Sequence, residues 1–189
     1  MNQIRKALDM YSKLSDKNWL SFASMLKKKI VVKKTLLLKE GQIENNLSFI
    51  EEGIIRFYIP KGEKEDLTFG FTFTNSFVSG YDSFITQEPS VYNLEALTPC
   101  ILWSINYKDL QEIYKKTDVG NTIGRLAAEG LFLQKAKREL SLLNETATQR
   151  YLRLLKEEPH FIKHIPQKYI ASFIGITPQA LSRIRRDIS

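Results

Sequence analysis

The hydrophobic pattern of this chain changes its period along the sequence, and that change is the strongest constraint on the fold. Between about residues 30 and 105, the apolar residues fall in short runs separated by turn residues. The segment Leu67–Phe73 alternates apolar and polar residues, as a half-buried strand does, and residues 47–59 are also rich in β-forming residues. Many short strands with turns between them predict a small antiparallel barrel or jelly roll. Helical spacing on both sides of this β-roll makes the expected fold class α+β.

Helical spacing comes before and after this β region. Residues 3–28 place apolar side chains three and four apart, and residues 109–144 return to the same spacing. The second region contains an imperfect heptad seam of the coiled-coil kind. We predict that residues 118–144 form a dimerisation helix, the alternative being an ordinary helix packed on its own β-roll. The seam positions are Val119, Ile123, Leu126, Gly130, Leu133, Lys137 and Leu140.

Residues 145–189 predict a compact helical unit. Thr146 is a good cap for a helix that Pro159 would end, and residues 167–174 form the next helix. Gly175 then permits a left-handed turn, and Thr177 followed by a proline begins a final helix. This order is a helix-turn-helix, in which the second helix can enter the major groove of DNA.

The final helix carries polar and basic residues on its predicted outer face. If Leu181 and Ile184 are buried, Gln179 and Arg183 point outward. An arginine can bind guanine through two contacts, and a glutamine can pair with adenine. The alternative interpretation is a plain helical hairpin with surface arginines. The predicted DNA-binding residues are Lys168, Thr177, Pro178, Gln179, Ser182, Arg183, Arg185 and Arg186.

The charge distribution favours a polyanionic partner for this unit. The chain has 28 Lys and Arg against 21 Asp and Glu, a formal net charge of +7. Residues 146–189 hold eight basic and three acidic residues, which fits DNA. We interpret the N-terminal lysines as a solvated face. The single cysteine, Cys100, is expected in the core, and it excludes an intramolecular disulfide and multi-cysteine metal sites.

Several motifs resemble those of the Crp/Fnr family of bacterial regulators. The motifs are Lys39–Gly41, Leu47–Gly53, Leu94–Ile105 and, most specifically, Ile170–Arg186. The resemblance covers the whole chain and implies three parts in a fixed order. These are a cyclic-nucleotide-binding-like β-roll with N-terminal helices at 1–117, a dimerisation helix at 118–144 and a winged helix-turn-helix at 145–189.

The resemblance also implies partners and roles for single residues. Gln179 and Arg183 stand at base-reading positions, and Thr177 and Ser182 stand at or near phosphate-contacting ones. Double-stranded DNA, a second copy of the chain and RNA polymerase are the implied partners. Pro178 departs from the family, which often has an arginine there, so one base contact is lost. Because the sequence ends shortly after the recognition helix, we expect a truncated winged helix.

The sequence predicts that cyclic AMP does not control this protein. Relatives that bind it carry a Gly-Glu pair and an arginine that pairs with the cyclic phosphate. Here Tyr81 follows Gly80, Ser90 stands near the arginine position, and no Lys or Arg lies between Lys64 and Lys108. We expect no cofactor, and either a neutral or apolar effector or none. The predicted effector pocket is Phe71, Gly80, Tyr81, Ser83, Ser90, Val91, Tyr92 and Leu126.

Other functional classes fit the sequence less well. Residues 30–105 contain no histidine, so the roll lacks the ligand cluster of metal-dependent β-roll enzymes, and we expect neither an enzyme nor a metal site. The remaining alternative is a signalling module that binds a nucleotide or small ligand and acts through a protein partner. With no signal peptide and no run of about 18 apolar residues, a cytoplasmic protein without a membrane partner is expected.

Overall fold

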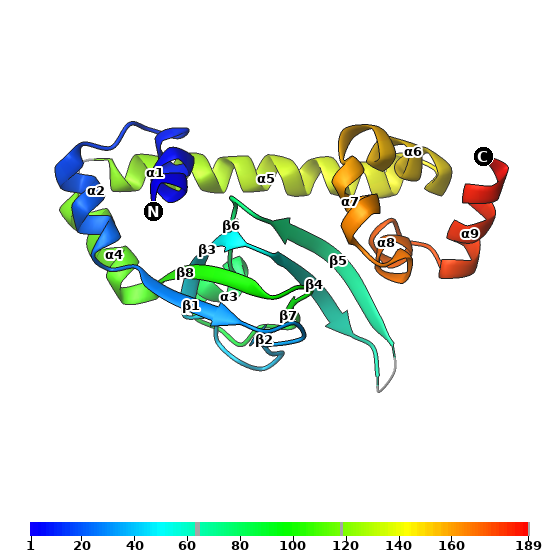
Figure 1. Ribbon diagram of the computed structural model, residues 1–189, viewed down its shortest axis with the longest axis horizontal. Coiled ribbons are helices and arrows are strands. Elements are labelled where there is room, and N and C mark those ends of the chain that lie inside the picture. The colour runs from blue at the N-terminus through cyan, green and yellow to red at the C-terminus, as the bar shows by residue number, and fades with distance from the viewer. Residues whose placement is uncertain (63–64, 118, 189) are drawn as a thin grey trace.

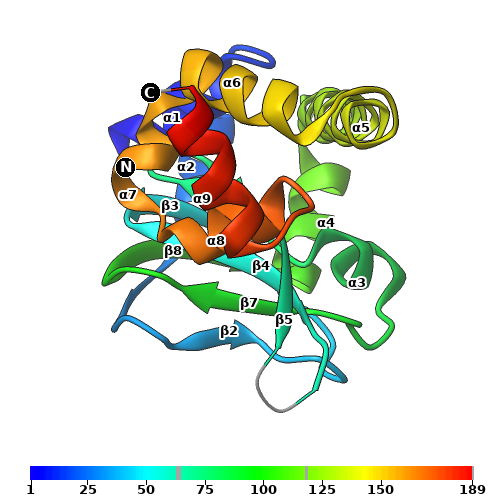
Figure 2. The ribbon, with the colours of Figure 1, turned by 90° about the vertical axis from the view of Figure 1, so that its right-hand side faces the viewer.

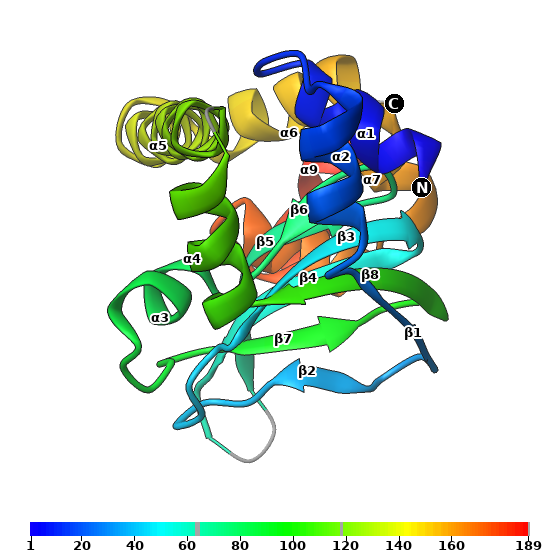
Figure 3. The same cartoon turned by 90° about the vertical axis from the view of Figure 1, so that its left-hand side faces the viewer.

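Two four-stranded antiparallel sheets form the centre of the molecule. The computed structural model describes residues 1–62, 65–117 and 119–188. One sheet has the strand order β1-β8-β3-β6 and the other β2-β7-β4-β5, and they pack face to face (Figures 1 and 3). The predicted antiparallel β-roll is confirmed. Its strands are β1 (Lys27–Val31), β2 (Leu36–Leu38), β3 (Asn46–Glu52), β4 (Ile54–Pro60), β5 (Asp66–Phe73), β6 (Phe77–Val78), β7 (Asn93–Ala96) and β8 (Cys100–Asn106).

A glycine divides the β-rich segment 47–59 into two strands that belong to different sheets. Gly53 has a φ of +113°, a conformation that residues with a side chain rarely adopt. A Cβ atom at this position would lie 2.4 Å from Sγ of Cys100 and 2.8 Å from the carbonyl oxygen of Pro99. Gly53 therefore permits the tight crossing from β3 to β4, which the continuous β pattern of the sequence did not reveal.

The N-terminal segment predicted as helical, residues 3–28, is two short helices and the start of a strand. The helices are α1 (Asn2–Asp9) and α2 (Asp16–Ala23), and the side chain of Ser15 caps the second one. The prediction was wrong at its end, because β1 begins at Lys27 and hydrogen-bonds along β8. Pairing with a distant strand overrides the local helical spacing there.

The helical region predicted at 109–144 is also interrupted. The first helix, α4 (Tyr107–Lys116), ends at Thr117, whose backbone is extended. The second, α5 (Gly120–Asn144), runs along the length of the molecule (Figure 1). Asp118, the first residue of the predicted dimerisation helix, lies outside the described residues. Neither α5 nor any other helix within the described ranges is long and apolar enough to cross a membrane.

Four more helices follow α5 in the described part of the chain. Thr146 and Gln149 form a reciprocal capping box at the start of the first one, as the cap prediction required. Pro159 ends that helix, as predicted, but it also begins another that the sequence did not predict, since proline suits the first helical position. These helices are α6 (Ala147–Glu157), α7 (Pro159–His164), α8 (Gln167–Phe173) and α9 (Pro178–Asp187).

Two apolar clusters stabilise the roll itself. Between the sheets, residues such as Ile50 and Leu94 are almost completely buried. Cys100 belongs to this cluster, as predicted, and burial raises the pKa of its thiol. On the outer face of the sheet β1-β8-β3-β6, Phe49 and Ile105 pack with residues of α1, α2 and α4. The N-terminal helices therefore cover one face of the roll (Figure 3).

A third apolar cluster joins the roll to the C-terminal helices. Phe71 and Phe73 of β5 pack against Phe161 of α7, with ring centroids 5.5 and 4.8 Å apart. Phe71 also packs against Phe173 of α8, at 5.5 Å. β5 is an edge strand of its sheet, and α8 packs along this side of the roll. In Figure 2, α9 lies in front of α8.

Candidate nucleic-acid interface

The turn between α8 and α9 has the geometry that its sequence predicts. Gly175 adopts the left-handed conformation, with a φ of +79°. The N–H of Ile176 donates to the carbonyl of Ala171, and the N–H of Gly175 donates to that of Ser172, both at 3.0 Å. This glycine-terminated turn ends α8 and redirects the chain, and Ile176 packs against the third cluster.

Helix α9, the predicted recognition helix, is anchored by one face and capped at its start. Thr177 Oγ1 accepts a hydrogen bond from the N–H of Ala180 at 3.2 Å, and Pro178 is the first helical residue. Leu181 is only 1% exposed, and Ile184 packs against the same cluster. With these two side chains turned inward, the opposite face of α9 is open to solvent.

Most of the predicted DNA-binding residues are exposed on α9 or at its cap. In Figure 2, α9 lies at the surface of the molecule, in front of α8. Arg183 makes no ion pair with any residue that the structure describes, and Arg186 lies 3.7 Å from the carboxylate of Asp187. Lys168 is exposed on α8, next to the ring of its neighbour Tyr169. Arg185 differs, because it is half-buried and already has an interaction within the protein. The exposed members on α9 and its cap are Thr177, Pro178, Gln179, Ser182, Arg183 and Arg186.

Other basic residues of the C-terminal region are engaged inside the protein. Nε of Arg150 donates to the carbonyl of Ile174 at 2.9 Å, at the end of α8. Arg153 donates to the carboxylate of Glu145 at 3.1 Å. Arg138 of α5 also donates to a carbonyl of α8, at 3.0 Å. The net positive charge of this region therefore overstates what DNA could contact, and the available arginines gather on α9.

The predicted effector residues on α3 (Tyr81–Thr86) and in the loop after it use their hydroxyl groups mainly in hydrogen bonds within the protein. Oγ of Ser83 accepts a hydrogen bond from the N–H of Glu44 at 3.0 Å. Oγ of Ser90 donates to the carbonyl of Tyr92 at 2.9 Å, and the Tyr92 hydroxyl donates to Asp82. These hydroxyl groups are therefore already used in holding the loop.

The same neighbourhood is acidic, although the fold brings one cation close to it. Burial, together with the hydrogen bond to Asp82, raises the pKa of Tyr92. The stretch between Lys64 and Lys108 has no cation, yet α5 places Lys135 over the ring of Phe69 at 5.4 Å, and this ring packs on Tyr92. Lys135 was not predicted at this site, because it is distant along the chain.

The structure does not gather all the predicted effector residues in one cavity of the described chain. Phe71 lies on the outer face of its sheet, against α7 and α8, because alternate residues of a strand face opposite sides. Val91 is 64% exposed, and Leu126 is half-buried on α5. Tyr81 turns toward an open hollow of about 460 Å³ between α3, α4 and α5. Gly80 is closely packed, since a Cβ there would lie 2.4 Å from Leu38.

The predicted dimer seam is divided between the inside and the outside of the chain. Val119 and Ile123 pack in the cluster beneath α4, so they are not free for a partner. Lys137 pairs with Glu157 of α6 at 3.2 Å. Gly130, Leu133 and Leu140 are exposed, as a contact with a second copy requires.

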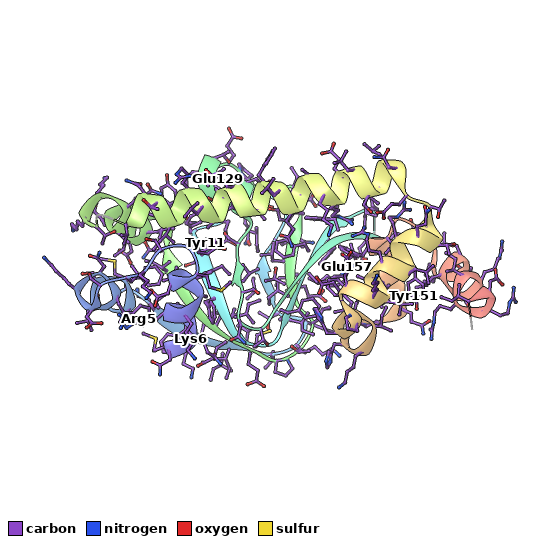
Figure 4. All side chains as sticks on the ribbon, turned by 90° about the horizontal axis from the view of Figure 1, so that it is seen from above. Arg5, Lys6, Tyr11, Glu129, Tyr151 and Glu157 are labelled. Carbon is purple, nitrogen blue, oxygen red and sulfur yellow. The ribbon has the colours of Figure 1, made fainter. Side chains whose placement is uncertain are left out.

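Two apolar residues that the heptad pattern omitted are the most exposed of the large hydrophobic residues on α5. Phe132 is 70% exposed and Leu143 is 74% exposed. With Leu133 and Leu140 they form an apolar strip that we call the α5 stripe, and α5 lies along one edge of the molecule (Figure 4). A helical wheel would have placed both residues on the exposed side of α5 if the side facing the β-roll had been known. The sequence does not say which side that is.

A buried arginine beneath the helix-turn-helix was not predicted from the sequence. Arg56 of β4 is 1% exposed, and its guanidinium lies 3.7 Å from the ring centroid of Tyr169 in α8. It donates to Oγ1 of Thr68 at 2.8 Å and pairs with Asp66. The backbone N–H of Thr68 in turn donates to Oγ of Ser172 at 2.8 Å. We call this set the Arg56 dock.

Comparison with known proteins fits the architecture described above. Residues 28–117 match the family model of the cyclic nucleotide-binding domain. No curated protein matches at the level of sequence. Among solved structures, the c-di-GMP-responsive global regulator CLP of Xanthomonas campestris is 19% identical, with a TM-score of 0.68, and the match covers 92% of this chain and 91% of CLP.

Two further solved structures match in the same way. FixK2 of Bradyrhizobium japonicum is 14% identical with a TM-score of 0.72, over 86% of this chain and 84% of that one. A Crp/Fnr-family transcriptional regulator from Eubacterium rectale is 17% identical with a TM-score of 0.71, over 93% and 83%. This chain has the fold of the Crp/Fnr regulators. The Crp/Fnr fold accounts for the order of β-roll, long helix and C-terminal helices that the sequence predicted.

Proposed function

We propose that this Crp/Fnr-like protein is a sequence-specific DNA-binding transcription regulator. The observation that carries the proposal is the open face of α9, where Gln179 and Arg183 lie on the opposite side from buried Leu181. Such a helix can enter the major groove, with Arg183 placed to reach guanine and Gln179 to reach adenine. Ser182 and Thr177 are placed for phosphate contacts. Because its partner would be chromosomal DNA, we place the protein in the cytoplasm. We propose no enzymatic activity for it.

Selection of bound DNA from a random pool tests this function directly. We expect one enriched palindrome with half-sites about 34 Å apart, since two recognition helices of a symmetric dimer read successive turns of one face of DNA. Binding should weaken steeply as salt concentration rises. A pool that shows no enriched sequence would contradict the proposal and favour the alternative of a signalling module that acts through a protein partner. RNA polymerase as a further partner stays a prediction.

We further propose that two copies of the chain pair through the α5 stripe. The domains would then be the β-roll at 1–117, the dimerisation helix at 118–144 and the helix-turn-helix at 145–189. Leucines such as Leu133 and Leu140 each contribute about 1.5–3 kcal/mol when fully buried. The double change Leu133→Glu and Leu140→Glu should therefore raise the dimer dissociation constant by more than about 100-fold in sedimentation equilibrium. Leu152→Glu is the matched control, because Leu152 is 45% exposed on α6, outside the stripe. Equal effects of both changes would exclude the stripe.

We also propose that cyclic AMP does not control the protein. A cyclic phosphate beside Tyr92 would face the negative charges of Asp82 and Glu44, which both act on that residue, and the nearby cation Lys135 already interacts electrostatically with Asp82. The same negative charges disfavour cyclic di-GMP, to which CLP responds, since it too is an anion. Calorimetric titration with each nucleotide should show no saturable heat, and saturable binding of either one at micromolar concentration would contradict this part of the proposal.

A further inference from the structure

The β-roll contains a second hollow, at the end formed by β1, that none of the predicted effector residues line. Its volume is about 230 Å³. Apolar side chains such as Leu37, Leu94 and Leu102 form its floor. Polar and charged side chains of β1, β3, β8 and the loop before β3 form its walls. The volume is below the range of about 300–1,000 Å³ that drug-sized ligands occupy, so any ligand is small.

Two lysines of the edge strand β1 face into this hollow. Val31 is buried between the sheets, and residues two and four positions before it share its face of the strand. Lys29 accordingly pairs in register with buried Leu102, and Lys27 pairs with Ser104. Neither lysine forms an ion pair with any residue in the described ranges. Their ammonium groups are thus available at the rim of the hollow.

Lys28, between them, faces the opposite side of the sheet. Its ammonium lies 5.4 Å from the ring centroid of Trp103 and 3.5 Å from the carboxylate of Glu51. The three consecutive lysines therefore divide into two that face the hollow and one that does not, which provides a control within the same strand.

A buried carboxylate also lines the hollow. Glu44 is 7% exposed and accepts hydrogen bonds from the N–H groups of Asn46 at 2.9 Å and Gly80 at 3.3 Å. A third backbone hydrogen bond, from Asn45, also lowers the pKa of Glu44, so about one of the four acceptor sites of this carboxylate remains. Burial raises the pKa of Glu44, and Lys29 is near enough to oppose that rise. An ammonium group of a ligand would supply the partner that this carboxylate lacks among described side chains.

A pair of serine hydroxyls completes the polar wall. Oγ of Ser48 and Oγ of Ser104 lie 2.7 Å apart, and one donates to the other. Two hydroxyls carry two protons, and this hydrogen bond uses only one of them. The other proton is a free donor beside the two lysines, as an anionic group would require.

We propose that this hollow binds a small zwitterion, an α-amino acid with an aliphatic side chain. Its carboxylate lies between Lys27 and Lys29 and accepts from the serine pair, its ammonium donates to Glu44, and its side chain rests on the leucine floor. The inference deepens the proposed function, because it names the ligand class of the sensor roll. A nucleotide is too large for the hollow, and a simple anion would leave Glu44 without a cationic partner within ion-pair distance in the described part of the chain.

Calorimetric titration of the whole chain with L-leucine tests the proposal. We expect saturable binding of one leucine per chain. Two analogues separate the charges: 4-methylpentanoate lacks the amine, and isopentylamine lacks the carboxylate. Each should bind at least about tenfold more weakly, since each loses one charged contact. Absence of saturable leucine binding overturns the proposal, and so does 4-methylpentanoate binding as tightly as leucine.

Variants of β1 sharpen the test. The double change Lys27→Met and Lys29→Met should weaken leucine binding at least about tenfold, whereas Lys28→Met should leave it unchanged. Equal weakening by both would mean a general charge effect and overturn the site. Glu44→Gln should remove the preference for leucine over 4-methylpentanoate. If this variant does not fold, as a thermal melt would show, the comparison with isopentylamine still reports on the ammonium contact.

Failure of this inference and failure of the proposed function give different results. The titration contains no DNA, so leucine binding without any enriched DNA sequence would contradict only the regulator proposal. An enriched palindrome without leucine binding would contradict only the ligand site.

Discussion

The helix-turn-helix has an inner and an outer face, and each face uses arginine and serine differently. On the inner face, Arg56 of the roll is buried against Tyr169, and Ser172 accepts a backbone hydrogen bond from β5. On the outer face, Arg183 and Ser182 are exposed. A buried charge needs partners within the protein, whereas an exposed one is free for phosphate or bases. Changes on the inner face should therefore alter stability, and changes on the outer face should alter DNA binding.

The inner face also explains why the helix-turn-helix is held in one orientation on the roll. Arg138 and Arg150 donate to carbonyls at the end of α8, and Tyr169 covers Arg56 from the other side. Contacts from β4, β5, α5 and α6 thus converge on one short helix. The direction of α9 relative to α5 follows from these contacts together.

The largest effect is expected for Arg56→Ala. Removing one partner of a buried ion pair lowers the free energy of unfolding by about 3–5 kcal/mol. Because Asp66 remains partly exposed, we expect the lower end of that range, measured by urea denaturation. Arg183→Ala is the matched control and should change stability by less than about 0.5 kcal/mol. If the two alanine variants were equally stable, the distinction between the faces would be lost.

Arg183→Ala should instead weaken DNA binding. Loss of a two-contact arginine–guanine pair costs roughly 1–3 kcal/mol, or about 5- to 150-fold in affinity for the selected sequence. Specificity should relax at one base pair, which binding to a set of singly substituted sites would show. Lys17→Ala removes the same charge from the exposed N-terminal region and should have little effect. Equal loss from both variants would mean that Arg183 contributes only through net charge.

Ser172→Ala tests the hydrogen bond between the roll and α8. The variant leaves the backbone N–H of Thr68, a fully buried residue, without its acceptor. An unsatisfied buried donor costs about 1–3 kcal/mol, so the urea midpoint should fall accordingly. Ser182→Ala, on the outer face, should leave stability within about 0.5 kcal/mol of the parent protein. A Ser172→Ala protein as stable as the parent would show that this hydrogen bond contributes nothing to holding α8 on the roll.

The smallest effect is expected for Thr177→Ala, at the boundary between the faces. Thr177 accepts the N–H of Ala180, and loss of such a cap costs about 1 kcal/mol. Thr177→Ser keeps the hydroxyl and should retain most of the stability in the same denaturation assay. If the Thr177→Ser variant were no more stable than Thr177→Ala, the side-chain cap would not explain why α9 starts where it does.

Local signals predicted the elements that depend on neighbouring residues. Thr146, Thr177 and Pro178 marked helix starts, and Gly175 marked the left-handed turn, because caps and turns involve residues a few positions apart. The same locality explains the errors. The heptad pattern could not show that Val119 and Ile123 turn inward, since the side of a helix that is buried depends on distant elements.

The sequence alone therefore determined the α+β class, the order of roll, long helix and helix-turn-helix, and the residues along the open face of α9. Only the tertiary structure decided which charges are buried and which are free. It brought Arg56 to Tyr169, Lys135 to Phe69, and Lys27 and Lys29 to Glu44. The physical reason is sequence separation, because periodicity and capping report only on residues near one another, whereas these contacts form when separate elements pack.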